Sequence, residues 1–154
     1  PSEDADRVRE AQEFGSRIHF GDGTRREVLR AAGAEDADLI VVCVDDAEIA
    51  KDIVRLVGNK FSRARLLVRA YDRTAAIQLI HMGVGDPVRE TFDAALRMGG
   101  LALTAIGLSD EDAAEAISDI RRRDERLLQL QVQQTADAGD DTLAALKKIK
   151  PEPV

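Results

Sequence analysis

The residues best suited to ligand chemistry lie in two loops, each directly after a short apolar run. One loop follows residues 18–20 and holds Gly21, Asp22, Gly23 and Thr24; the other follows residues 39–44 and holds Asp45 and Asp46. If both runs are strands of one parallel sheet, the loops lie at the same edge, where open α/β folds bind their ligands. The two aspartates have a second possible role, since Asp at the start of a helix caps it and favours its dipole.

Both loops belong to one strand-helix-strand unit over residues 18–46. Thr24 followed by Glu27 forms a capping box that predicts the start of a helix, and Gly33 predicts its end. The uninterrupted apolar run at 39–44 predicts a parallel strand that is buried on both faces. Cys43 lies inside this run, which favours a buried, structural cysteine.

Predicted strands and helices alternate over the first two thirds of the chain. Apolar residues at helical spacing predict helices over 4–14 and 47–61, and Asp72 predicts the start of a helix that runs to about residue 82. Residues 66–68 and 84–88 are further predicted strands. The alternation predicts an α/β fold with a Rossmann-like, doubly wound parallel sheet. Because the sequence opens on a helical pattern, we expect the N-terminal strand-helix-strand portion of such a sheet to be missing.

Composition argues against several classes of protein. A net charge of -7, no Trp and one Tyr disfavour a nucleic-acid partner, which needs a basic face and stacking platforms. One cysteine allows no disulfide within the chain, which favours a cytoplasmic compartment. The longest apolar runs are far below the ~18 residues of a membrane-spanning helix. His19 and His81 are isolated and no Cys/His cluster has metal-ligand spacing, so we expect neither an enzyme nor a metal site.

The last third has a different pattern. Residues 90–107 are apolar on most sides, which predicts a helix buried either between the sheet and a second subunit or between the sheet and the next helix of the same chain. Ser109 predicts the start of a long helix to about residue 134. Asp124 lies on the apolar stripe of that helix, where a carboxylate usually has a partner or a function. Arginines at 121–123 and 126 are the candidate partners.

These patterns predict three parts. Residues 1–108 form a partial Rossmann-like domain with its crossover helix, residues 109–134 form the long C-terminal helix, and residues 135–154 form a polar, mobile tail with a short amphipathic piece.

Two strings resemble a known family. GDGTRREVLRAAGAEDADLIVV, which begins at Gly21, and VRETFDAALRMGGLAL, which begins at Val88, are similar to the cytoplasmic regulatory domain of Kef-type glutathione-regulated potassium efflux antiporters, a domain of the TrkA-N or RCK type. The resemblance covers residues 3–130. Gly23 departs from the pattern, since the family usually has alanine there.

The resemblance implies a regulatory domain that gates potassium/proton exchange. It would be attached to a membrane antiporter domain of the same parent protein, at the cytoplasmic face of the bacterial inner membrane, and would form a homodimer through the helix at 90–107. AMP or NAD(H) would lie across the carboxyl edge of the sheet, although the phosphate loop of such a site is not in this sequence. The implied cofactor-binding residues are Gly21, Asp22, Gly23, Thr24, Asp45, Asp46 and Arg69. A pair of carboxylates there suits an unphosphorylated ribose better than an extra phosphate.

For glutathione as a regulatory ligand, the resemblance points to Arg89 and Asp124. Arg89 matches the arginine of the family's R-E-T-F string and is suited to pair with a glutathione carboxylate. Asp124 stands where the family has asparagine, and its charge would repel glutathione's carboxylates unless arginines neutralise it. The alternative within the same fold is a peripheral NAD(H)-sensing regulatory subunit of a potassium uptake system.

Overall fold

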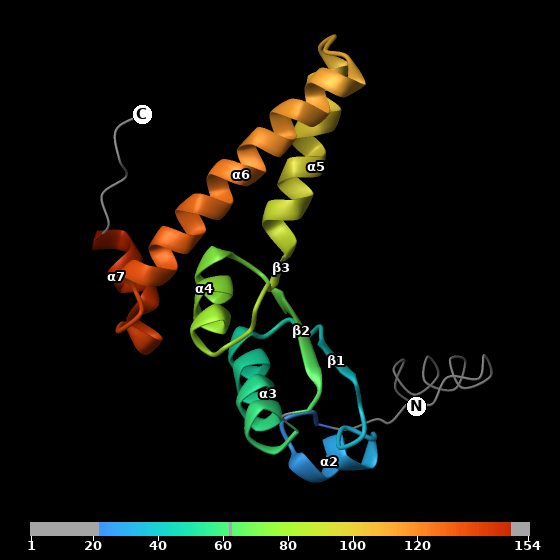
Figure 1. Cartoon of the computed structure of the whole chain (residues 1–154), viewed down its shortest axis with the longest axis vertical. Coiled ribbons are helices and arrows are strands. Elements are labelled where there is room, and N and C mark those ends of the chain that lie inside the picture. The colour runs from blue at the N-terminus through green and yellow to red at the C-terminus, as the bar shows by residue number, and fades with distance from the viewer. Residues whose placement is uncertain (1–21, 62, 149–154) are drawn as a thin grey trace, which may run out of the picture.

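The fold is a small parallel sheet with helices on one side and a long helical hairpin (Figure 1). The computed structural model describes residues 22–61 and 63–148. The strands pair in the order β1 (Leu39–Val42), β2 (Arg65–Ala70) and β3 (Val88–Arg89), all parallel. Helix α3 (Ala47–Lys60) joins β1 to β2, and α4 (Arg73–His81) joins β2 to β3. This alternation confirms the predicted α/β fold. The expected helix at 4–14, the expected strand at 18–20 and Gly21 lie outside the described residues.

One face of the sheet carries the hydrophobic core. Val42 and Val68 are buried on this face, where they pack with apolar side chains of α3 and α4 such as Val57 and Leu79. Neighbouring residues in a strand point to opposite faces, so the other face is formed by Leu39, Val41 and Leu67. Leu39 is 50% exposed and Val41 53%, which makes the prediction of a strand buried on both faces wrong for the described part of the chain.

The strand ends also differ from the prediction. Strand β1 stops at Val42, two residues earlier than expected, so Cys43 leaves the sheet and is exposed. The prediction of a buried cysteine is therefore wrong. Strand β2 is longer than predicted, whereas β3 has only two residues. Pro87 directly precedes β3 and has no N–H to donate to a neighbouring strand, which limits the pairing there.

Side-chain caps fix most of the helix starts. Asp46, Asp72 and Ser109 cap α3, α4 and α6 (Asp110–Gln134), each by accepting hydrogen bonds from backbone N–H groups of the first turn. The predicted capping box at Thr24 is wrong, because the Thr24 hydroxyl donates to Asp22 Oδ1 at 2.6 Å. Helix α2 (Arg26–Ala31) instead begins after Arg25, whose side chain makes no capping hydrogen bond.

Helix α2 ends where the sequence predicts. Gly33 has φ of 90°, a left-handed conformation that glycine adopts without strain. The N–H of Ala34 donates to the carbonyl of Leu29 at 3.0 Å, which closes the helix end.

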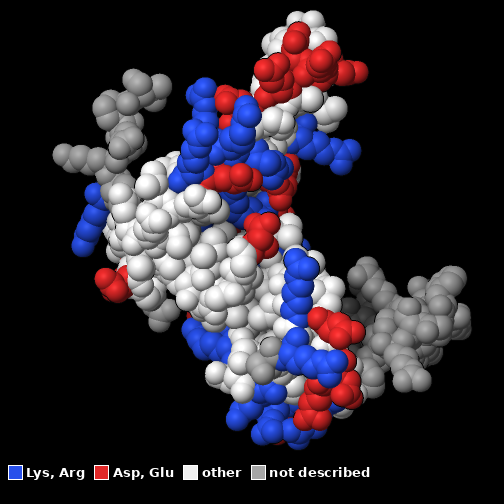
Figure 2. All heavy atoms as spheres, in the orientation of Figure 1, with Lys and Arg blue, Asp and Glu red and all other residues white. Residues whose placement is uncertain are grey.

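Helices α5 (Glu90–Ala105) and α6 form a hairpin that extends away from the sheet (Figure 1). Gly99 and Gly100 of α5 face Ile117 of α6. Among the described residues Leu96 is the buried one of α5, so within this chain the helix is covered on the side that faces α6, and its burial against a second subunit stays a prediction. Acidic residues gather at the hairpin tip, where they lie in the first turn of α6 (Figure 2). In the described ranges no helix is both long and apolar enough to cross a membrane.

The chain after α6 folds back onto α4. Thr135 and Thr142 are buried, a 3-10 turn spans Gly139–Asp141, and α7 (Thr142–Lys148) contacts α4. The hydroxyl of Thr135 donates to the carbonyl of Gln131 at 2.6 Å, which ties this segment to α6. The first part of the predicted tail is therefore folded against α4, its mobility stays a prediction, and residues 149–154 lie outside the described residues. The predicted domain boundaries stay a prediction.

Candidate functional site

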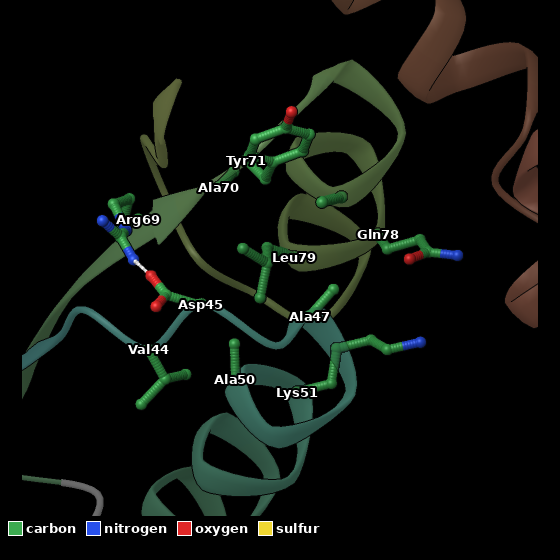
Figure 3. A pocket seen from close by; sticks show the side chains of 11 residues that line it. Val44, Asp45, Ala47, Ala50, Lys51, Arg69, Ala70, Tyr71, Gln78 and Leu79 are labelled. Atoms are coloured by element: carbon green, nitrogen blue, oxygen red, sulfur yellow. Dashed lines mark hydrogen bonds and ion pairs between the residues drawn. The ribbon is translucent and has the colours of Figure 1, made fainter. Parts of the chain in front are cut away.

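Arg69 and Asp45 meet at the carboxyl edge of the sheet (Figure 3). The parallel register pairs Val42 of β1 with Val68 of β2, so the loop after β1 lies beside the end of β2. Arg69 Nη2 donates to Asp45 Oδ1 and to the carbonyl of Cys43, the latter at 3.3 Å. Two residues that the sequence placed in separate loops are thus brought together.

Arg69 also pairs with the first residue of α5. Its Nη1 lies 3.4 Å from Glu90 Oε2, so the guanidinium bridges two carboxylates. The hydrogen bond to Asp45 raises the pKa of Arg69, and the charge of Glu90 adds to the effect. The Asp45 side chain is 98% exposed, whereas that of Arg69 is 28% exposed. An incoming anion can therefore replace the exposed Asp45 carboxylate at a guanidinium that is already in position.

A recess of about 300 Å³ opens beside this pair, lined by Val44, Asp45, Arg69, Tyr71 and Glu90. A smaller cavity of about 20 Å³ lies next to it, between the start of α3 and the middle of α4 (Figure 3). Tyr71 is 63% exposed and offers an aromatic face at the rim of the recess. The sequence analysis missed Tyr71 and Glu90. Their signal was position, since each directly follows a strand of the sheet.

The turn at Asp22, Gly23 and Thr24 has mainly local contacts. Asp22 Oδ1 accepts from the backbone N of Thr24 at 2.9 Å as well as from its hydroxyl, and these hydrogen bonds lower the pKa of Asp22. A Cβ at Gly23 would lie 3.3 Å from Ile53 Cδ1 of α3. Glycine at this position therefore lets the turn pack closely on α3.

Asp46 caps a helix, the second of the two roles that the sequence predicted for it. Its Oδ1 accepts from the backbone N of Glu48 at 2.8 Å and of Ile49 at 3.1 Å, so the carboxylate caps α3. Of the two adjacent aspartates, Asp45 faces the recess and Asp46 closes the helix end.

Asp124 lies at the centre of a second charged cluster. Its Oδ1 accepts from Arg73 Nη1 at 2.5 Å, and its Oδ2 accepts from Arg89 Nη2. The predicted network with arginines of the same helix is wrong, because Arg121 pairs with Asp93. The sequence analysis missed Arg73, which lies 51 residues away in the chain. The structure does bring together the two predicted ligand residues, Arg89 and Asp124.

This cluster is largely shielded from solvent. The side chains of Arg89 and Asp124 are 10% and 15% exposed. Burial raises the pKa of Asp124, but the hydrogen bonds from Arg89 and Arg73 outweigh it and hold the pKa below the ordinary value. The Arg89 guanidinium also lies over the Phe92 ring, 4.0 Å from its centroid.

The two clusters meet in the sequence at Arg89 and Glu90. Arg89 is the last residue of β3 and pairs with Asp124, while Glu90 begins α5 and pairs with Arg69. The junction between sheet and hairpin is thus the point that both charged clusters share.

A parallel α/β sheet with charged side chains and a recess at its carboxyl edge is typical of a Rossmann-like domain. The chain belongs to the TrkA-N domain family, whose pattern matches residues 2–90.

The chain is similar to proteins named as glutathione-regulated potassium-efflux system proteins. The chain is 32% identical over 141 residues to the glutathione-regulated potassium-efflux system protein KefC of Cronobacter sakazakii, covering 92% of this chain and 22% of that protein. It is 34% identical over 125 residues to the glutathione-regulated potassium-efflux system protein of Haemophilus influenzae, covering 81% of this chain and 20% of that one. The chain thus spans about a fifth of the length of these relatives.

A solved structure has the same fold. The Kef CTD of Shewanella denitrificans in an AMP-bound form superposes with a TM-score of 0.73 at 35% sequence identity, covering 77% of each chain. This likeness confirms the Rossmann-like fold class.

Proposed function

We propose that this chain is a ligand-sensing regulatory domain of a bacterial potassium/proton antiporter that mediates potassium efflux. The observation that carries the proposal is the Asp45–Arg69 pair at the carboxyl edge of the sheet, in a chain similar to the Kef CTD in an AMP-bound form. An adenine nucleotide at this edge is the signal, and the hairpin that begins at Glu90 is the element that receives it.

The recess suits a nucleotide with a single phosphate. Arg69 supplies one guanidinium for an anion, and the exposed ring of Tyr71 supplies a surface on which a base can stack. The carboxylates of Asp45 and Glu90 accept hydrogen bonds from ribose hydroxyls and disfavour additional phosphates. Asp46 supports this edge of the sheet by capping α3. Gly21, Asp22, Gly23 and Thr24 belong to the same proposed site.

The signal passes through the ion pair between Arg69 and Glu90, because a ligand at Arg69 must disturb that pair. A phosphate at Arg69 competes with Glu90, and Glu90 is the first residue of α5. Loss of this ion pair changes how α5 is held against the sheet. In the parent protein α5 would transmit the change to a membrane antiporter domain of the same chain, with this domain at the cytoplasmic face of the bacterial inner membrane.

The outer face of α5 supports a homodimer. Six residues spaced along this face are apolar and exposed: Ala94, Ala95, Met98, Leu101, Ala102 and Ala105. Met98 is 73% exposed and Leu101 63%. A continuous apolar stripe rich in alanine allows two helices to approach closely. The proposed partner is α5 of a second copy.

Glutathione enters the proposal through Arg89 and Asp124. The relatives named above are glutathione-regulated. The guanidinium of Arg89 is held in place by its contact with the Phe92 ring. A glutathione carboxylate is the proposed partner of Arg89. Any such ligand would also contact Asp124, because Asp124 pairs with Arg89.

Calorimetry with AMP tests the nucleotide site. Arg69→Ala should weaken AMP binding at least ten-fold, since a charged hydrogen bond contributes about 1.5–3 kcal/mol. Arg55→Ala is the matched control, because Arg55 pairs with Asp52 on the exposed side of α3. Equal AMP affinity in wild type and Arg69→Ala would remove Arg69 from the site. Preference for NADH over AMP would favour the regulatory subunit of an uptake system instead.

A further inference from the structure

Arg73 and Arg89 direct their guanidinium groups at one point, and Asp124 fills that point. We propose that the two arginines form a carboxylate-binding site that the chain occupies with its own Asp124. A ligand carboxylate binds there only by displacing Asp124, and with it the middle of α6. This inference deepens the proposed function and rests on it for the natural ligand, whereas the site itself rests on geometry.

The contacts are those that a free carboxylate would make. Each oxygen of Asp124 accepts from a different arginine: Oδ1 from Arg73 Nη1 at 2.5 Å, and Oδ2 from Arg89 Nη2. The arginines come from separate elements, since Arg73 begins α4 and Arg89 ends β3. Two guanidinium groups that share one carboxylate in this way satisfy both of its oxygens with charged donors.

Other contacts hold both arginines in position. Arg89 lies over the Phe92 ring at 4.0 Å, and Arg73 Nε donates to Gln131 Oε1. Phe92 and Gln131 are both neutral, so neither competes with a carboxylate for charge. The guanidinium groups therefore have supports that remain when Asp124 is replaced.

The cluster keeps an excess of positive charge. In the described part of the chain, Asp124 is the one carboxylate that forms an ion pair with Arg73 or Arg89. Two guanidinium charges against one carboxylate leave a net charge of about +1 in a partly desolvated place. Without the Asp124 charge the site holds both positive charges, and its attraction for an external anion rises.

Occupancy of this site is linked to the position of α6. Asp124 lies in the middle of α6, and Arg73 also reaches Gln131 of that helix. The tether of α6 gives Asp124 a high effective concentration, so a free carboxylate competes poorly. A ligand that does displace Asp124 breaks the ion pairs that hold α6 against α4 and β3. Ligand binding here therefore loosens the hairpin from the sheet.

Chemical rescue tests the site directly. Asp124→Gly removes the resident carboxylate and leaves room for formate. Asp119→Gly is the control, because it makes the same backbone change on α6 at a carboxylate that pairs with the exposed arginines Arg122 and Arg123. Thermal unfolding of both variants and wild type is followed by circular dichroism in sodium formate and in sodium chloride of equal ionic strength.

Formate should raise the Tm of Asp124→Gly alone. At ten times its Kd a ligand shifts the folding equilibrium about ten-fold, which is about 4 °C for a chain of this size. The rise should vanish in Asp124→Gly/Arg89→Ala. No specific rise in a folded Asp124→Gly, or an equal rise in Asp119→Gly, would overturn the proposal.

A second variant decides the matter if Asp124→Gly does not fold. Asp124→Asn keeps the side-chain volume, and calorimetry should show glutathione binding at least ten-fold tighter than in wild type. Equal binding by the two proteins would overturn the self-occupied site. AMP binding is measured in the same samples: its absence would refute the nucleotide proposal but leave the formate result interpretable, and its presence without rescue would refute only this inference.

Discussion

The exposed stripe of α5 gives a dimer prediction with a definite magnitude. Leu101 is 63% exposed in the single chain, and Leu101→Glu places a charge at the centre of the proposed interface. Full burial of a large apolar side chain contributes about 1.5–3 kcal/mol, so burying the exposed part contributes about 1–2 kcal/mol. A two-fold dimer contains the residue twice, which doubles the loss to about 2–4 kcal/mol. The dimer Kd should therefore rise about 30- to 700-fold.

Sedimentation equilibrium over a range of concentrations measures this Kd. Glutamate is a good helix former and Leu101 has little intrachain packing, so the circular dichroism of the monomer should not change. Leu143→Glu is the control, since Leu143 is 51% exposed on α7 and lies outside the proposed interface. An unchanged Kd in Leu101→Glu, or an equal increase in Leu143→Glu, would show that α5 does not form the interface.

Variants at three further positions test the internal contacts by chemical or thermal unfolding. Asp124→Asn should lose about 3 kcal/mol at neutral pH, because it leaves two guanidinium groups without their carboxylate. Because the pKa of Asp124 is lowered in the folded chain, its ion pairs stabilise the fold fully above about pH 4. The difference in stability between Asp124→Asn and wild type should therefore disappear as the pH falls through the lowered pKa. A difference that persists in acid would contradict this. Asp46→Ala should lose about 1 kcal/mol through the cap of α3, with Asp46→Asn near wild type, and equal losses would argue against capping. Gly100→Ala should raise the free energy of unfolding by up to about 1 kcal/mol, since the added Cβ would lie 3.5 Å from Ile117, an ordinary contact. A loss of stability would show that α5 and α6 are packed more tightly than this distance indicates.

Features that depend on a few neighbouring residues could be predicted from the sequence. The cap at Ser109 and the helix end at Gly33 follow from backbone groups within three or four positions, and both are confirmed. Thr24 shows the limit of such rules. Its hydroxyl had two possible partners, the first turn of the helix and Asp22, and local spacing favours neither. The prediction that Cys43 is buried was wrong for a related reason, because an apolar run does not show where pairing between strands stops.

Features that depend on packing between distant segments could be predicted only in part. The sequence placed Asp45 and Arg69 at strand ends, and parallel register then brought them together. The apolar surface of α5 was recognised, but an all-round apolar helix does not show which side its own chain covers. That side proved to be the one facing α6, since Gly99 and Gly100 lie against Ile117.

Asp124 shows how geometry can narrow the choice of partners before a structure is known. On a helix, residues three or four positions apart are neighbours, whereas residues one or two positions apart point in different directions. Arg122, Arg123 and Arg126 lie within two positions of Asp124 and so cannot easily reach its carboxylate. Arg121 is at the right spacing but pairs with Asp93. A carboxylate on an apolar stripe without a partner on its own helix must find cations on another element, and the structure supplies them from α4 and β3.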